Sequence, residues 1–262
     1  MSGATVSVTF DNLGEVTALA RGEWPPDEPL GRHFSVTRAL PRILELLAGS
    51  GLRATFFVEG LNAELYPDTL RGLAAAGHEV AYHGWRHEPW AELDPARERE
   101  LLERGLRHLE ALDLRPVGFR PPGGELTAAS VGLLRRLGFA YCSPAGDVVE
   151  AVDGLAVLPF RWRLVDAVHY LPRFAGLRER ELGARDPLPP ARLRAAFARA
   201  LDGAARADAF VALVFHPFLA DAGERFDVLR AALERVRALV DAGALRCAPC
   251  RDVAAAVRAQ AS

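Results

Sequence analysis

The chain contains no lysine, and its charges almost cancel. All 32 basic residues are arginine, and with 34 acidic residues they leave a formal net charge of −2. A net charge so close to zero gives no general attraction to nucleic acid or to an anionic membrane surface. We attribute the missing lysine to a compositional bias shared with the abundant alanine, rather than to a role for arginine in clamping anions.

Cysteine is also scarce. The three residues Cys142, Cys247 and Cys250 are too few, and odd in number, for a disulfide framework. Cys247 and Cys250 form a CxxC pair, but no second Cys or His pair lies nearby to complete a tetrahedral zinc site. We interpret the pair as structural, with redox activity as the less favoured alternative.

Long apolar runs are missing as well. No run approaches the ~18 residues that cross a bilayer. The first strand-like stretch begins at Thr5, which leaves no room before it for an export signal. We therefore expect a cytoplasmic protein with no membrane partner.

The 262 residues are 50% apolar, enough for one large core. Short β-branched or aromatic runs alternate with helical patterns along the whole chain, which predicts a single α/β domain over residues 1–262, built as a barrel or doubly wound sheet. About seven parallel strands are expected, at Thr5–Phe10, Ala54–Val58, Glu79–Tyr82, Val117–Phe119, Phe139–Tyr141, Ala156–Leu158 and Phe210–Phe215. The main helices are expected at Val36–Ala48, Tyr66–Ala76, Ala96–Leu112, Ala128–Leu137, Pro190–Ala204 and Phe226–Ala242.

One segment interrupts this alternation. Residues 159–190 are rich in Arg, Trp and Pro and match neither pattern. Irregular stretches of that length inside a compact domain are often lids or binding loops. Trp162 and Tyr170 could form aromatic walls over a bound ring, although packing within the loop is the simpler interpretation.

Acidic, imidazole and guanidinium groups follow four of the predicted strands. Because ligands bind at the carboxyl ends of strands in α/β proteins, these places are the candidate site. They are Thr9-Phe10-Asp11-Asn12, His83-Gly84-Trp85-Arg86-His87, Arg120-Pro121-Pro122-Gly123 and Phe215-His216-Pro217.

Each segment suggests a chemical role beside a structural one. His83 and His87 lie four residues apart, and on a helical turn that spacing would let both imidazoles bind one divalent cation. Asp11 could be a turn residue or a general base that takes a proton from water, and Arg120 would keep it ionised and orient it. His216 could protonate a leaving amine or merely bind a backbone carbonyl.

Taken in order, these motifs resemble those of the polysaccharide deacetylase family, carbohydrate esterase family four. Ala54-Thr55-Phe56-Phe57-Val58 and Gly77-His78-Glu79-Val80 resemble its connecting strands, so the likeness covers nearly the whole chain. The resemblance implies a distorted (β/α) barrel that hydrolyses an amide C–N bond, usually by deacetylating an amino sugar with a divalent metal, commonly zinc. It also implies Asp11 as base, Arg120 as its partner, His216 as acid, and His83 and His87 as metal ligands.

Asn12 departs from the family pattern, which usually has a second Asp there. The third metal ligand is then the neutral Asn12 amide oxygen, a displaced group such as Glu15, or missing. Loss of an anionic oxygen should weaken metal binding.

The segment Trp162–Tyr170 and the missing export signal resemble a cytoplasmic branch of the family that includes allantoinase-like and cyclic-imide-hydrolase-like proteins. Members of that branch can lack the metal and often form homo-oligomers. Three hypotheses follow. They are a metal-assisted deacetylase of a sugar or small metabolite, a metal-independent hydrolase of a cyclic amide or imide, and a non-catalytic binding protein with a degenerate metal site.

Overall fold

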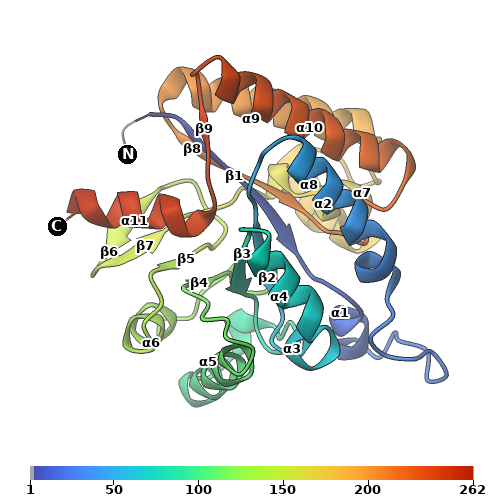
Figure 1. Cartoon of the computed structure of the whole chain (residues 1–262), viewed down its shortest axis with the longest axis vertical. Coiled ribbons are helices and arrows are strands. Elements are labelled where there is room, and N and C mark those ends of the chain that lie inside the picture. The colour runs from blue at the N-terminus through green and yellow to red at the C-terminus, as the bar shows by residue number, and fades with distance from the viewer. Residues whose placement is uncertain (1–2, 262) are drawn as a thin grey trace.

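Short buried strands build one curled sheet, and helices cover its outer surface (Figure 1). The computed structural model describes residues 3–261. Met1, Ser2 and Ser262, which complete the predicted single domain of residues 1–262, lie outside the described residues. Domain organisation itself stays a prediction.

The strands follow the order β6-β7-β5-β4-β3-β2-β1-β8, and β9 pairs separately with β1. Among the described residues every strand pairing is parallel except that of β6 with β7. The strands are β1 Thr5–Asp11, β2 Thr55–Val58, β3 Glu79–Tyr82, β4 Gly118–Phe119, β5 Tyr141–Cys142, β6 Glu150–Val152, β7 Leu155–Val157, β8 Phe210–Phe215 and β9 Arg246–Cys247.

Most of the helices connect successive parallel strands, because parallel neighbours need a crossover connection. The longer ones are α2 Leu40–Gly49, α4 Pro67–Ala75, α5 Pro95–Glu110, α6 Ser130–Arg136, α8 Ala175–Leu182, α9 Pro190–Ala207, α10 Gly223–Asp241 and α11 Cys250–Ala261. The short ones are α1 Val16–Ala20, α3 Asn62–Leu65, α7 Asp166–Tyr170, a π-helical turn η1 Ser35–Ala39, and the 3₁₀ turns η2 Trp90–Glu92, η3 Trp162–Leu164 and η4 Pro172–Phe174. Figure 1 shows α9 and α10 side by side at the top of the view, and α5 and α6 next to each other at the bottom.

The segment 159–165 lies between the two ends of the sheet. Phe160 forms an isolated parallel bridge with Ala145, beyond β5, and Val165 forms another with Val214 of β8. The chain therefore spans the gap with two single bridges in place of a continuous strand. This is the distorted α/β barrel that the sequence predicts.

Aromatic rings pack between the sheet and its helices, where Phe215 also lies 5.0 Å from Phe197 of α9. Phe10 of β1 stacks on Phe56 of β2 with ring centroids 4.9 Å apart, and on Phe215 of β8 at 5.7 Å. All seven residues of β1 are buried. This packing fixes β1 between its two neighbours and so fixes the position of the residues that follow it.

Each of the seven predicted strands overlaps an observed one, but the prediction for residues 159–190 is wrong. Residues 159–190 are not an irregular loop, because they contain η3, α7, η4 and α8. The strands β6 and β9 and the helix α11 were not predicted; both strands are short and partly exposed, so they carry little apolar pattern.

Candidate active site

The carboxyl ends of the parallel strands bring the predicted site residues together. β1 ends at Asp11, β3 is followed by His83, β4 by Arg120 and β8 by His216. Strands that run parallel in one sheet end at the same edge, so side chains distant in sequence converge there. One cavity of about 220 Å³ is lined by all six predicted residues, Asp11, Asn12, His83, His87, Arg120 and His216.

Asp11 and Arg120 form a buried ion pair. Arg120 Nη1 donates to Asp11 Oδ1 at 2.7 Å, and the two side chains are 1% and 7% exposed. Arg120 also donates to Thr9 Oγ1 at 2.9 Å and to Ser143 Oγ at 3.0 Å, and its guanidinium lies 3.9 Å from the centroid of the Phe57 ring. Asp11 is therefore held in one orientation by a cation that is itself fixed on several sides.

The turn after Arg120 uses glycine where a side chain would not fit. Gly123 and Gly124 have φ of +80° and +82°. A Cβ atom on Gly124 would lie 2.7 Å from the Trp162 ring, closer than real Cβ contacts allow. This glycine therefore lets Trp162 pack against the turn and enter the cavity wall.

His83 and His87 meet, but not by way of a helical turn as the spacing suggests. Their ring centroids lie 5.0 Å apart with an interplanar angle of 78°. Residues 83–89 are irregular, and the chain reverses there because Gly84 and His87 adopt left-handed φ of +78° and +63°. The helical geometry is thus wrong although the pairing of the two rings is right.

Both imidazoles are neutral in this environment. Burial lowers the pKa of His83 to about 3, and burial together with His83 and Arg21 lowers the pKa of His87 well below its usual value. His83 Nδ1 lies 2.8 Å from the Arg120 carbonyl oxygen. Because a carbonyl can only accept, Nδ1 carries the proton and Nε2 keeps a free lone pair.

Asn12 has an unusual backbone and a buried oxygen that lacks a partner. Its φ is +61°, in the left-handed region that Asn tolerates better than most residues. Its Oδ1 atom is buried with no hydrogen-bond partner in the structure. An orphaned amide oxygen beside two neutral imidazoles is a donor set suited to a divalent cation, so these residues fit the metal that the resemblance implies.

The donor set carries no negative charge of its own. Within residues 3–261, no group of three or more His, Cys, Asp or Glu side chains is placed to hold a metal ion. The proposed set differs from such groups in having Asn12 as its third member. Its affinity then depends on one amide oxygen in place of a carboxylate.

The sequence reading missed Asp166, which fixes His216. Asp166 Oδ1 lies 2.5 Å from His216 Nδ1, and Oδ2 accepts the His216 backbone N–H at 2.8 Å. The carboxylate thereby binds Nδ1–H and leaves Nε2 available to the cavity. Asp166 follows the apolar pair Leu164-Val165, much as Asp11 follows Phe10, but no strand pattern marks the place.

Two residues that the sequence left as alternatives lie outside the cavity. Glu15 is not a displaced metal ligand, because it is buried outside the cavity and accepts hydrogen bonds from the Tyr66 hydroxyl at 2.5 Å and the Gly31 backbone N–H at 2.6 Å. Tyr170 does not line the cavity, and the Arg225 guanidinium stacks on its ring at 4.6 Å.

Aromatic walls and two additional arginines complete the cavity. The rings of Phe160, Trp162 and Phe174 line its sides. Arg21, which ends α1, and Arg173, in η4, also line it. The sequence analysis singled out neither arginine, since each is one of 32 and follows no strand.

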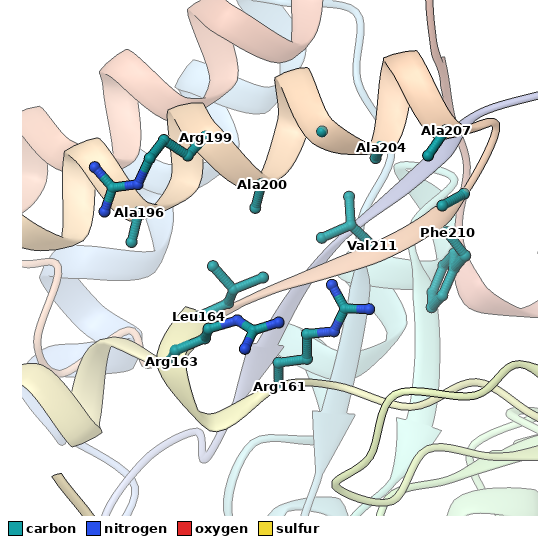
Figure 2. Close-up of a pocket in the computed structure, with 12 residues that line it drawn as sticks. Arg161, Arg163, Leu164, Ala196, Arg199, Ala200, Ala204, Ala207, Phe210 and Val211 are labelled. Carbon is teal, nitrogen blue, oxygen red and sulfur yellow. The ribbon is translucent and has the colours of Figure 1, made fainter. Parts of the chain in front are cut away.

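A second, larger hollow lies at the other end of β8 (Figure 2). It measures about 390 Å³, and its walls are Phe210 and Val211 at the start of β8, alanines of α9, and three arginines. Figure 2 shows the Arg161 and Arg163 side chains below the alanine face of α9. No acid, histidine or nucleophile lines it, so it has no means of performing hydrolysis.

Neither the cysteines nor the helices add a further site. Cys142, Cys247 and Cys250 are free, and burial raises the pKa of Cys250 to about 12 and that of Cys247 to about 11. Both members of the CxxC pair are therefore thiols at neutral pH, as a structural role requires.

In the described part of the chain, no helix combines the length and the apolar character needed to cross a membrane.

Comparison with known sequences extends this picture. The family model described as polysaccharide deacetylase matches residues 1–142. A peptidoglycan deacetylase-like protein of Gibberella zeae is 34% identical over 103 residues, which are 38% of this chain and 30% of that protein. The match to this protein and to other curated relatives spans less than half of their length.

Solved structures cover more of the chain. A protein of Mycobacterium smegmatis assigned to the polysaccharide deacetylases is 31% identical, with a TM-score of 0.82 over 98% of this chain and 92% of that one. An allantoinase structure aligns with a TM-score of 0.75 over 95% of this chain and 88% of the other, at 20% identity. The second likeness concerns the fold alone.

Proposed function

The chain belongs to the polysaccharide deacetylase family, and from that premise we propose that it hydrolyses a non-peptide carbon–nitrogen bond. The reaction that fits best is metal-assisted removal of an acetyl group from an N-acetylated sugar or small metabolite. One observation carries the proposal. The Asp11–Arg120 pair and His216, which is held by Asp166 from outside the cavity wall, line the same cavity as two neutral imidazoles.

Asp11 acts as the general base. Arg120 binds Oδ1, which leaves Oδ2 to accept a proton from water as the water oxygen bonds to the amide carbon. The fixed guanidinium keeps the carboxylate from rotating away from that water. Thr9 and Ser143 position Asp11 through Arg120.

His216 acts as the general acid. Asp166 holds Nδ1, so Nε2 is the nitrogen that faces the substrate. When the C–N bond breaks, Nε2–H of the protonated ring donates its proton to the leaving nitrogen. Asp11 and His216 thus take one proton from water and give one to the amine, and the products are a carboxylic acid and an amine.

We propose that Asn12, His83 and His87 hold a divalent metal, zinc by preference. When bound, such an ion supplies positive charge that polarises the amide carbonyl. The Arg120 carbonyl fixes the His83 ring through Nδ1, which points Nε2 at the proposed site. The side chains need no proton release to bind, because both imidazoles are already neutral.

The size of the cavity favours small substrates. Sites for drug-sized ligands typically measure ~300–1,000 Å³, and the volume here is about 220 Å³. A single sugar unit or a small metabolite matches this volume better than several residues of a polymer. The aromatic walls suit the face of a ring.

The uncharged donor set favours one alternative, metal-independent hydrolysis of a cyclic amide or imide. There, Asp11 and His216 would perform the proton transfers without an ion. The third hypothesis, a binding protein with a decayed site, is less favoured because both buried acid–base pairs are intact. A cytoplasmic location and a homo-oligomeric state stay predictions.

Product analysis tests the proposed activity. The enzyme is incubated with N-acetylglucosamine, its short oligomers, N-acetylated amino acids and cyclic amides, as purified, after chelation, and after zinc is restored. We expect release of acetate from at least one acetylated compound that falls on chelation and returns with zinc. Ring opening that is indifferent to chelation would support the metal-independent alternative, and no cleavage of any C–N bond under any condition would refute the proposal.

Zinc binding tests the ligand set separately. Calorimetry should give one zinc per chain, and His83→Ala or His87→Ala should abolish binding, whereas His108→Ala, on the surface beside Glu64, should leave it unchanged. Asn12→Asp should tighten binding at least about tenfold, because it restores an anionic oxygen. Equal affinity in Asn12→Asp and the native protein would exclude Asn12 as a ligand.

A further inference from the structure

Two arginines at the cavity have no part in the acid–base chemistry. Arg21 and Arg173 come from segments far apart in sequence and line the same cavity as Asp11 and His216. Arg21 also lies close enough to His87 and to Arg173 to lower the pKa of both. Arg21 therefore lies near His87 and near Arg173.

The charges of these two arginines are poorly balanced within the protein. Arg120 is neutralised by Asp11, but the ion-pair partner of Arg21 is Glu23, at 4.0 Å and with a side chain 61% exposed. Among the ion pairs of residues 3–261, none includes Arg173, and its guanidinium lies 5.2 Å from the Phe174 ring centroid. Glu23 also acts on the charge of Arg173, but one exposed acid shared by two cations does not account for two arginines at one cavity.

The cavity around Arg21 and Arg173 favours the binding of an anion. Arg21 and Arg173 are exposed at the edge of the cavity, and burial, followed by the charge of Arg21, lowers the pKa of Arg173, although Glu23 opposes this shift. A partly enclosed cavity with excess positive charge attracts anions and holds them more strongly than open water does.

We propose that the substrate is a small amide that carries a carboxylate, held by Arg21 and Arg173 while its amide group lies between Asp11 and His216. A carboxylate matches the planar, two-pronged geometry of a guanidinium and is compact enough for this cavity. Phe160, Trp162 and Phe174 contact the uncharged part of the molecule. This inference rests on the proposed function, and it assigns Arg21 and Arg173 as specificity-determining residues.

Matched pairs of probes test the inference. 4-Acetamidobenzoate and 4-acetamidobenzamide share the acetylated nitrogen and the ring and differ by one negative charge. N-Acetylglycine and N-acetylglycinamide repeat the comparison without a ring. Dissociation constants are measured by calorimetry for the native protein, Arg21→Gln, Arg173→Gln, the double variant, and Arg199→Gln, which alters an arginine of the hollow at the other end of β8.

We expect the native protein to bind the acid of at least one pair roughly tenfold to a hundredfold more tightly than its amide. The preference should fall in each single variant, vanish in the double variant and persist in Arg199→Gln. It should also weaken as salt is raised. Equal binding of acid and amide, no binding of either acid, or a preference that survives in the double variant would overturn the inference.

Hydrolysis of the same probes separates this inference from the proposed function. Arginine-dependent preference for the acid without cleavage would support the anion site while refuting the proposed reaction for these amides. Cleavage of acid and amide with equal kcat/KM in both pairs would overturn the anion site while leaving hydrolysis intact.

Discussion

Removal of the Arg120 guanidinium should destabilise the protein strongly, and by an amount tied to Asp11. Arg120→Met keeps much of the side-chain volume but deprives Asp11 of its partner at 2.7 Å and leaves Thr9 and Ser143 without their donor. Because both charged side chains are almost fully buried, an uncompensated carboxylate remains inside the barrel. Breaking one partner of a buried pair typically costs about 3–5 kcal/mol, and we expect a loss of unfolding free energy in that range.

A double-mutant cycle separates the charge interaction from lost packing. Asp11→Asn alone leaves Arg120 buried without a counter-charge, so it should also destabilise. The double variant removes both charges and should be more stable than the sum of the single effects predicts, by about 2–3 kcal/mol. Guanidinium chloride unfolding at neutral pH measures all four proteins.

The exposed pair Arg235–Asp202 provides the control. Its charged atoms are as close, at 2.6 Å, but the side chains are 46% and 34% exposed. The same cycle there should give a coupling below about 1 kcal/mol. A coupling between Asp11 and Arg120 no larger than that of the surface pair would refute the view that Arg120 holds Asp11 in the site.

Three further predictions concern titration and the acid–base pairs. Zinc affinity should stay nearly constant between pH 8 and pH 5.5. The pKa of His83 is about 3 and that of His87 is well below its ordinary value, so neither ring gains a proton in this range. A drop in affinity of tenfold or more centred near pH 6.5 in a binding titration would contradict this. Burial raises the pKa of Glu59 to about 8, so between pH 4.5 and 8 the folded protein keeps a proton that the unfolded chain loses, and its stability falls as pH rises. Metal-free Glu59→Gln should therefore gain stability relative to the native protein by up to about 2.7 kcal/mol between pH 6 and 8 in denaturant titrations, and a difference that does not change with pH would disprove the shift. Asp166→Asn should lower kcat roughly 100-fold to 10,000-fold in the folded protein, because His216 loses the carboxylate that fixes its ring, and an unchanged kcat would remove Asp166 from the mechanism.

The strands and the site were predictable where local pattern and topology agree. Apolar runs such as Phe210–Phe215 form strands in the structure, and polar residues that follow them gather because parallel strands end at one edge. Asp11, His83, Arg120 and His216 could be found from this rule alone. The resemblance supplied the roles that the rule could not.

What could not be predicted depends on contacts across long sequence separations. Asp166 pairs with His216 across 50 residues of chain, and nothing local marks it. Arg21 and Arg173 come together only when their connections fold over the cavity mouth. His83 and His87 do not lie on a helical turn, because residues with left-handed φ replace the expected helix. The four-residue spacing of the two histidines cannot reveal such residues.

The most direct test of the account is the turnover of Asp11→Asn on the amide that the native enzyme cleaves. The variant should bind zinc, since Asp11 is not among its proposed ligands, and its kcat should fall by about 100-fold to 10,000-fold. Full turnover by a folded, zinc-bound Asp11→Asn protein would contradict the claim that Asp11 activates the attacking water.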